Sequence, residues 1–376
     1  MISPRSASID YGSLLTPPAD YSVDFALGTT YSLDLHALVC SCLSLGLSVD
    51  VDSVLAEDEL YLFSALAEMK GKLAVMCEKG RIQGAKDYSR LYCMVEEAIV
   101  EVDLDPGGRT YPSFHPKTWI VRFAPDDGSG PVCYRICVLS RNLTFDSSWD
   151  VAGCFDGEYR EGHSSASRGG RDLSAYLVSL LKHCRTKAHE GKIKQMISEI
   201  PYVNFGAKSA ESLTGCRLVL PFSFTGVEGA RSFSDEFAVR LDRAERVLVM
   251  SPFISASPGA GDPLARIANT FEGSRERPLL VTRKASLAKA AQDAVLAEKL
   301  RTFSLFALRD DLIAAQFENE ANGGSEDSGE PGLGHRDIHA KVQTACATST
   351  LDRRTRRAGD LRSTRRRWPI CGLRRA

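Results

Sequence analysis

Residues 113–150 read SFHPKTWIVRFAPDDGSGPVCYRICVLSRNLTFDSSWD, two apolar segments separated by a turn rich in Asp, Gly and Pro. The pattern predicts two paired strands, and alternation along a strand puts residues i and i+2 on one face. We therefore expect His115 and Lys117 to project together, and Ser140 and Asn142 to project together opposite them. This set fits cleavage of a phosphate diester, because an imidazole can attack phosphorus or protonate the leaving oxygen while Lys and Asn neutralise charge.

A second His-x-Lys occurs far downstream in RDIHAKV at 336–342, where His339 and Lys341 follow an acidic, glycine-rich linker. Taken alone, a His-x-Lys on a strand is more often a half-exposed polar surface than an active site. Catalysis by a pair of histidines needs one as nucleophile and one as acid. Two copies of the motif therefore favour the functional interpretation.

The composition is that of a soluble globular protein: 376 residues, 43% hydrophobic and 25% charged, which is enough for two domains. The formal net charge of −1 hides an asymmetry. Residues 343–376 carry ten Arg against two Asp, so the rest of the chain has a net charge near −9. An acidic body is not typical of a strong non-specific DNA binder, so any nucleic acid would have to bind in a local groove.

Neither a signal peptide nor a membrane span is predicted: the N-terminus lacks a basic start, and the longest apolar run, 36–49, is too short. The eleven cysteines form no CxxC pair or zinc-ligand array, which favours reduced thiols in a cytoplasmic protein. His183, Cys184 and His189 are interpreted as polar residues on a helix surface. We therefore expect no metal and no other cofactor.

The two halves of the chain repeat one order of elements. TTYSLD at 29–34 matches SPFISA at 251–256, LAVMCEKGRI at 73–82 matches LLVTRKASL at 279–287, and a His-x-Lys comes last in each half. This repetition predicts an α/β protein with two duplicated lobes, each a mixed sheet flanked by helices. We expect an irregular lead-in at 1–22 and a first lobe at 23–205. A second, incomplete lobe should follow at 206–342, and a disordered Arg-rich tail at 343–376.

Apolar spacing predicts helices at 57–72 and 286–300, and two helices over 172–200 that separate near Glu190 and Gly191. Ser32 or Asp34 is a candidate N-cap for a helix that follows the first strand. These elements test the periodicity of the sequence independently of its motifs.

With a His-x-Lys in each half and LSRNLT after the first, the sequence resembles the phospholipase D superfamily over about residues 23–342. The resemblance implies that the two halves face one active site across a pseudo-twofold axis, and that the reaction passes through a phosphohistidine. Which His is the nucleophile stays open. The resemblance implies a catalytic role for His115, Lys117, His339 and Lys341. It implies phosphate binding by Ser140 and Asn142, and orientation of a catalytic His by Asp150.

Two departures from the family pattern matter. Many members have an Asp five residues after the Lys, where this chain has Arg122 and Cys346. After Val342 the second half lacks a Ser-x-Asn and continues in Arg-rich sequence. The tail is either native and binds acidic partners or nucleic acid, or out of frame. We favour the second interpretation, because a domain that stops one strand after its His leaves a sheet edge unpaired.

The favoured function is a metal-independent phosphodiesterase, namely a DNA nuclease of a defence or restriction type, because SRNLTFDSSWD is similar to prokaryotic, defence-associated members. One alternative is a phospholipase or another small-diester hydrolase, although no membrane-binding helix is predicted. Another is a non-catalytic module that binds nucleic acid or a helicase or methyltransferase partner. A homodimer is a further alternative, since some relatives build their site from two chains.

Overall fold

The chain divides into two compact units, each described by itself: a first unit of Ile9–Phe145 and Ala152–Arg231, and a second of Met1–Ser8, Asp146–Val151 and Ser232–Ala376. The structure is a computed structural model. The residues that it describes are 11–47, 59–84, 90–104, 113–144, 150–162, 165–184, 186–207, 244, 246–254, 263–273, 276–308, 342–346 and 373–375.

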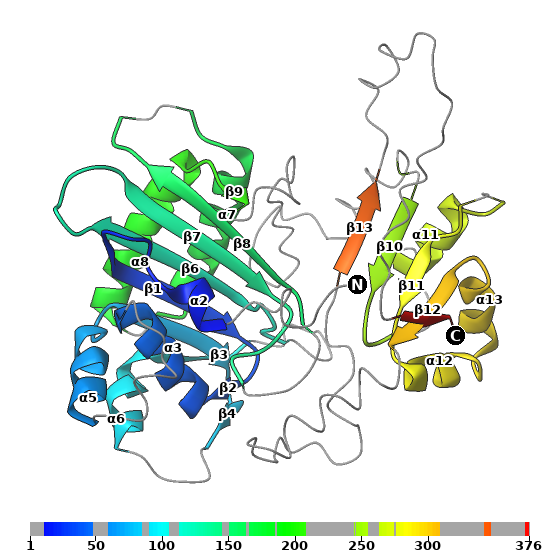
Figure 1. The fold of residues 1–376 in the computed structure, drawn as a ribbon, viewed down its shortest axis with the longest axis horizontal. Helices are drawn as coiled ribbons and strands as arrows, with labels where there is room; N and C mark the ends of the chain where they lie inside the picture. The colour runs from blue at the N-terminus through cyan, green and yellow to red at the C-terminus, as the bar shows by residue number, and fades with distance from the viewer. Residues whose placement is uncertain are drawn as a thin grey trace. The chain divides into compact units, whose positions relative to one another are not determined.

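The first unit is built on a seven-stranded mixed sheet with the strand order β5-β3-β1-β6-β7-β8-β9 (Figure 1). Strands β5, β3 and β1 are parallel, and β6 to β9 continue the sheet as antiparallel neighbours. The strands are β1 (Tyr21–Thr30), β3 (Leu73–Glu78), β5 (Ile99–Val102), β6 (Thr118–Pro125), β7 (Val132–Leu139), β8 (Ala152–Tyr159) and β9 (Gly206–Ala207). A parallel two-stranded ribbon, β2 (Leu33–Asp34) with β4 (Ile82–Gln83), lies beyond β1 and β3 in the chain.

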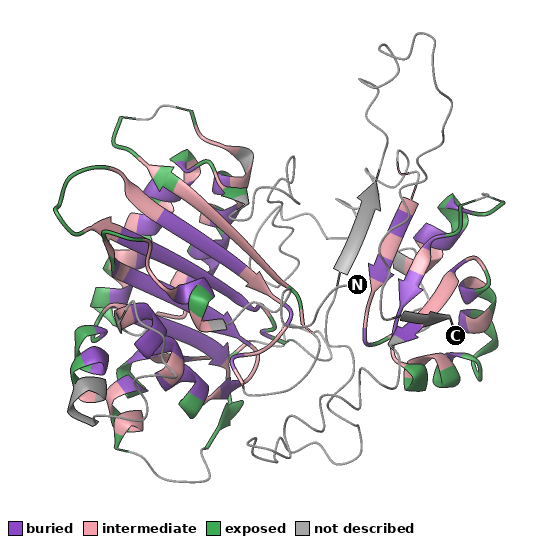
Figure 2. Ribbon diagram, in the orientation of Figure 1, coloured by how far each residue is buried: buried purple, intermediate pink, exposed green. Residues whose placement is uncertain are grey.

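Helices cover both faces of this sheet (Figure 1). One buried cluster combines side chains of α3 and α5 with one face of the strands, including Leu38, Leu43 and Leu66. The other combines α7 and α8 with the opposite face, including Tyr176 and Ile193. Figure 2 shows the burial concentrated on the strands between these layers. The helical segments are α2 (Tyr11–Leu15), α3 (Leu35–Leu47), α5 (Glu59–Glu68), α6 (Leu91–Val95), η1 (Glu96–Ala98), α7 (Arg168–Leu181), α8 (Lys187–Glu199) and η2 (Ile200–Tyr202).

Helix starts follow the capping chemistry of the sequence. Asp34 caps α3, as predicted, because its Oδ1 accepts a hydrogen bond from the Ala37 amide at 3.0 Å. The break between α7 and α8 lies at 182–186 and not near Gly191, because the Thr186 hydroxyl accepts from the His189 amide and starts α8 there. His189 is also buried, with 4% exposure, so its interpretation as a surface residue is wrong.

The second unit repeats the arrangement of the first on a five-stranded sheet of order β13-β10-β11-β12-β14. Strands β10, β11 and β12 are parallel, with antiparallel β13 beside β10 and antiparallel β14 beside β12. The described elements are β10 (Arg246–Met250), α11 (Pro263–Thr270), β11 (Leu279–Val281), α12 (Lys284–Ala290), α13 (Ala294–Leu300), β12 (Ser304–Leu308), β13 (Val342–Cys346) and β14 (Leu373–Arg375). The helix predicted at 286–300 is two helices, because Asp293 caps α13.

The mixed α/β class with a duplicated unit is therefore confirmed: β5-β3-β1-β6 and β12-β11-β10-β13 have the same order and directions. The prediction of disorder over 343–376 is wrong for β13 and β14, which pair with β10 and β12. These strands were not predicted because their sequences lack apolar alternation, which backbone pairing does not require. Among the described residues, no strand pairs with the outer edge of β13.

No helix in the described part of the chain combines the length and the apolar character needed to cross a lipid bilayer. Eight of the cysteines in that part, from Cys40 to Cys184, are not joined in a disulfide.

Candidate active site

The candidate residues of the first unit gather at one edge of its sheet, where β1, β3 and β7 end and β6 begins. His115 and Lys117 come just before β6, and Ser140 and Asn142 just after β7. They were expected on the strands themselves, so this placement corrects the prediction. Strand ends are freer than strand interiors to direct side chains toward a ligand, because the ladder no longer fixes both faces.

His115 and Lys117 face each other, as the sequence predicted. The Lys117 ammonium nitrogen lies 2.9 Å from His115 Nδ1 and 3.3 Å from Nε2. Because an ammonium offers only donors, the ring nitrogen that it contacts must be an acceptor, so the contact requires a neutral imidazole. His115 is exposed, whereas Lys117 has only 6% exposure. The arrangement thus presents a neutral, accessible imidazole over a buried positive charge, which fits attack on an anionic phosphorus centre.

The backbone just before His115 is fixed by a carboxylate at the end of β3 and by a buried ring. The Glu78 carboxylate, at the end of β3, accepts hydrogen bonds from the Phe114 amide at 2.7 Å and from the Ser113 hydroxyl at 2.9 Å. Phe114 itself is fully buried in the cluster under α7 and α8. The short segment that carries His115 is therefore held to β3 in advance of any ligand.

Lys117 is held from the other direction by a buried hydroxyl network. The hydroxyls of Thr29 and Thr118 lie 2.8 Å apart, the Thr118 amide donates to Thr29 Oγ1 at 3.1 Å, and the Tyr176 hydroxyl donates to the same oxygen at 3.3 Å. Burial raises the pKa of Tyr176 to about 12, so this hydroxyl stays a donor. The network fixes the residue after Lys117 and with it the direction of the ammonium group.

The loop after β7 docks on the end of β1. The Leu143 amide donates to Thr30 Oγ1 at 2.9 Å, and the Asp34 amide donates to the Leu143 carbonyl at 2.8 Å. Ser140 is buried, with 8% exposure. Asn142 Oδ1 is buried and has no hydrogen-bond partner among the described residues. A buried polar atom without a partner is costly, and an amide that a ligand satisfies is one explanation.

The other predicted site residues are not placed beside His115. His339 and Lys341 lie outside the described residues. They directly precede β13, whose Val342 pairs with Met250 of β10, just as Thr118 after Lys117 pairs with Thr29 of β1. Asp150 lies two residues before β8 and groups with the second unit, so its role as an orienting acid stays a prediction.

Sequence reasoning missed three contributors to this edge: Glu78, Tyr31 and Arg81. The Tyr31 ring lies against His115, with the two ring centroids 4.8 Å apart, and the Arg81 guanidinium carbon is 5.0 Å from the Tyr31 centroid. Tyr31 stood inside the repeated TTYSLD segment, so its position at a strand end was a usable signal. Glu78 and Arg81 likewise stood inside the repeated LAVMCEKGRI segment, but their contacts join segments that are far apart in the chain and had no signal.

Arg122, at the position where the resemblance implied an Asp, faces away from this edge into a buried ionic cluster. Its guanidinium donates to both carboxylate oxygens of Glu199, at 2.9 and 3.1 Å, and to Asp24 at 2.9 Å. The Tyr134 hydroxyl also donates to Glu199, at 2.5 Å. Burial alone would raise the pKa of Glu199, but the hydrogen bonds from Arg122 and Tyr134 outweigh it and lower that pKa. Arg122 therefore stabilises the sheet and α8, a structural use of the position.

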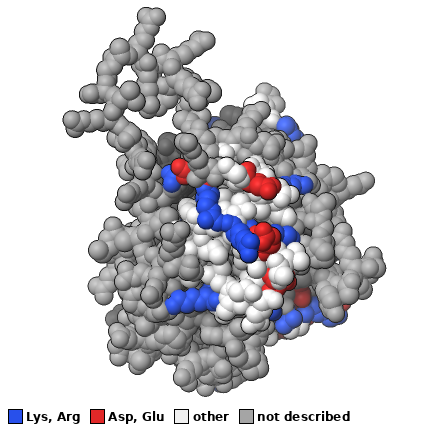
Figure 3. Space-filling view, turned by 90° about the vertical axis from the view of Figure 1, so that its right-hand side faces the viewer, with Lys and Arg blue, Asp and Glu red and all other residues white. Residues whose placement is uncertain are grey.

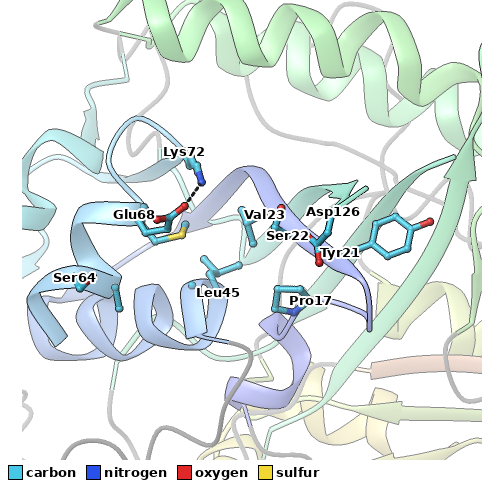
Figure 4. Close-up of a pocket in the computed structure, with 12 residues that line it drawn as sticks. Pro17, Tyr21, Ser22, Val23, Leu45, Ser64, Glu68, Lys72 and Asp126 are labelled. Atoms are coloured by element: carbon cyan, nitrogen blue, oxygen red, sulfur yellow. Dashed lines mark hydrogen bonds and ion pairs between the residues drawn. The ribbon is translucent and has the colours of Figure 1, made fainter. Parts of the chain in front are cut away.

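Two cavities in the first unit are lined by residues other than the candidates. One, of about 290 Å³, lies where β1 and β3 begin, at the opposite end of the sheet, beside Tyr21, Glu68 and Lys72 (Figure 4). Its Glu68 and Lys72 form an ion pair at 2.9 Å, which the figure marks. The other, of about 520 Å³, is lined by Arg122 and Glu199. In both cavities the charged lining residues named here already pair with each other, Glu68 with Lys72 and Arg122 with Glu199.

The described residues form no cluster of metal ligands, and one face of the molecule shows mixed charge. No group of three or more His, Cys, Asp or Glu side chains that could hold a metal occurs in the described ranges. Where described residues are visible in Figure 3, Lys and Arg side chains lie beside Asp and Glu.

Comparison with known proteins gives limited similarity. No family model matches the chain, and no curated protein does. Among solved structures, it is similar to polyphosphate kinase from Porphyromonas gingivalis, with 10% identity, a TM-score of 0.33 and coverage of 79% of this chain and 38% of that one. It is also similar to phosphatidylserine synthase from Haemophilus influenzae Rd KW20, with 9% identity, a TM-score of 0.43 and coverage of 89% and 72%. At these values, function has to be argued from the site itself.

Proposed function

We propose that this chain is a phospholipase D-like enzyme that cleaves phosphodiesters without a metal, and that its substrate is DNA. The observation that carries the proposal is the exposed imidazole of His115, whose Nδ1 lies 2.9 Å from the buried Lys117 ammonium nitrogen. It is supported by the second His-x-Lys, which directly precedes the topologically equivalent strand β13 of the second unit. The reduced thiols are consistent with action in the cytoplasm.

In the proposed mechanism, one histidine nitrogen attacks phosphorus, a P–N bond forms and the P–O bond to the leaving group breaks. The other histidine donates its proton to the leaving oxygen. It then removes a proton from water, whose oxygen attacks phosphorus and breaks the P–N bond. His115 and His339 fill these two roles in either order. Lys117, Lys341, Asn142 and Ser140 neutralise the non-bridging oxygens, and Asp150 orients a histidine.

The test is a diesterase assay in EDTA on single-stranded DNA, double-stranded DNA and a chromogenic phosphodiester, with wild type and His115→Ala. Cleavage that survives EDTA and disappears in the variant supports the proposal and identifies the substrate class. Cleavage that needs a divalent metal, or that the variant retains, refutes it. Hydrolysis of the small diester alone would replace DNA by a phospholipid or another small diester as the substrate.

A non-catalytic binding module is the second candidate, and one observation favours it. Among the described residues no strand covers the outer edge of β13, and the sequence after it lacks a Ser-x-Asn. Such a protein would bind nucleic acid, or a helicase or methyltransferase, without cutting. A homodimer that completes the site from two chains is the remaining alternative, and the molar mass in solution would test it.

A further inference from the structure

The edge that carries His115 also carries an aromatic side chain paired with an arginine. Tyr31 is the first residue after β1, and Arg81 follows β3. The Arg81 guanidinium carbon lies 5.0 Å from the Tyr31 ring centroid, and the Lys117 ammonium nitrogen lies 6.0 Å from it. The Tyr31 ring is thus shared by two cations and by the His115 imidazole, whose ring is tilted by 39° against it.

The second unit also carries an aromatic–arginine pair after the two corresponding strands, although not at the same register positions. Phe253 follows β10, which corresponds to β1, and Arg283 follows β11, which corresponds to β3. The Arg283 guanidinium carbon lies 4.9 Å from the Phe253 ring centroid. Phe253 is 59% exposed, an unusual state for a side chain of this size.

Local hydrogen bonds hold the two aromatic residues in place. In the first unit, the Thr30 hydroxyl donates to the Ser32 carbonyl at 2.7 Å, around Tyr31. In the second, the Ser251 hydroxyl donates to the Phe253 carbonyl at 2.7 Å. The two turns correspond, with Tyr31 as the middle residue of the first and Phe253 as the last residue of the second. A single surface aromatic–arginine contact is ordinary, but its repetition at both equivalent strand ends is not explained by packing.

We propose that Tyr31–Arg81 and Phe253–Arg283 are binding platforms for unpaired nucleotides, which makes single-stranded nucleic acid the substrate class. Each ring stacks on a base, and each guanidinium pairs with a phosphate of the strand that its own unit binds. The inference rests on the proposed function, since it places the scissile phosphate at His115. Bases in a duplex are stacked and unavailable to the rings, and a phospholipid offers neither a base nor a neighbouring phosphate.

Binding can be measured separately from cleavage in the full-length His115→Ala protein, with a fluorescein-labelled single-stranded dT 20-mer followed by anisotropy. We expect Tyr31→Leu and Arg81→Gln each to raise Kd about tenfold, and Phe253→Ser to raise it by a similar factor. Tyr31→Phe keeps the stacking surface and should bind like its parent. Lys70→Gln is the matched control, because Lys70 is a 71% exposed cation before β3, at the other end of that strand.

The cleavage arm uses Phe253→Ser, now with His115 intact, on the single strand and on dihexanoylphosphatidylcholine, because Tyr31 lies against His115 and its replacement would disturb cleavage of either substrate. Loss of DNA cleavage with lipid cleavage unchanged supports the platforms. Equal loss on both substrates, or unchanged affinity of Tyr31→Leu and of Phe253→Ser for the single strand, overturns them. Circular dichroism of each variant shows that the fold is retained, and Phe253→Ser removes an exposed ring that the core does not need.

The two proposals can fail separately. Activity of the wild type on lipid alone, with no affinity for the single strand, refutes the platforms and leaves the diesterase. The opposite result is also informative. If the wild type cleaves neither substrate but the variants bind the single strand more weakly than their parent, the platforms are supported and the diesterase is refuted.

Discussion

The two units share four strands and differ in what surrounds them. In the first, β7, β8 and β9 continue the sheet beyond β6, and the loop after β7 brings Ser140 and Asn142 to the same end of the sheet as His115. In the second, β13 is the last strand on its side among the described residues. The first unit thus has a site with both a His-x-Lys and a polar loop, whereas the described residues of the second unit include β13 but no loop after it, and its His-x-Lys is given by the sequence alone.

The comparison divides the features of the first unit into those that both units share and those described in the first unit alone. The shared strands place a His-x-Lys before an antiparallel strand and an aromatic–arginine pair at the neighbouring strand ends. Those described in the first unit alone are the polar loop and the Arg122–Glu199 cluster, which joins β6 to α8. If the proposed mechanism is right, both copies contribute a histidine but only the first contributes a complete phosphate-binding set.

The largest expected effect comes from the histidines. His115→Ala should lower diesterase activity at least about a thousandfold, roughly 4 kcal/mol of transition-state stabilisation, because the nucleophile or the acid is lost. His339→Ala should cause a comparable loss if both units act in one reaction. Single-turnover assays of both variants, with Lys70→Gln as the control, measure this. A wild-type rate for His339→Ala would mean that the first unit works without the second.

The next effect concerns stability and should be confined to the first unit. Glu199→Gln removes the carboxylate that accepts from Arg122 and Tyr134, so the free energy of unfolding should fall by about 3 kcal/mol. Hydrogen–deuterium exchange along a denaturant series reports the two units separately. Protection should fall in β6 and α8 and stay unchanged in β10 and β11. A loss spread evenly over both sheets would show that the units unfold together.

Acid should weaken the first unit through the same carboxylate. The pKa of Glu199 is lowered below its ordinary value of 4.5, because its hydrogen bonds from Arg122 and Tyr134 outweigh the effect of burial. The unfolded chain then binds a proton more readily than the folded one, so the stabilisation is complete above pH 4.5 and is lost as the pH falls through the folded-state value. Denaturation midpoints of wild type between pH 6 and 3 should show this fall. The same slope in Glu199→Gln would contradict it.

Much of the fold was accessible from the sequence because it depends on local periodicity. The apolar runs predicted β1, β3 and β10, and the capping residue Asp34 predicted where α3 begins. The repeated order of segments predicted the duplicated unit. What failed were boundaries set by a single hydrogen bond, such as the start of α8 at Thr186, which competes with an otherwise continuous helical pattern.

The site was predictable in part. Spacing alone brought His115 and Lys117 together, since the two residues are neighbours on one segment. The sequence could not show that Glu78 fixes Phe114, or that Arg81 reaches the Tyr31 ring, because those contacts depend on the order of strands in the sheet. Burial of Arg122 also had no signal, since its partners Asp24 and Glu199 are distant in the chain.

The smallest effects test whether the two units can be perturbed one at a time. Thr186→Ala removes the acceptor for the His189 amide at the start of α8, and Asp293→Ala removes the acceptor for the Val295 and Leu296 amides at the start of α13. Each should cost about 1 kcal/mol in its own unit, with the larger loss for Asp293, whose charge also interacts favourably with the helix dipole. Thr186→Ser and Asp293→Asn keep an acceptor and serve as matched controls. If each alanine variant lowers exchange protection only in its own unit, the units are separately stable, and a joint active site has to be formed by their association. If Asp293→Ala also lowers protection around Thr118, the two units are coupled in stability, and the second unit supports the first.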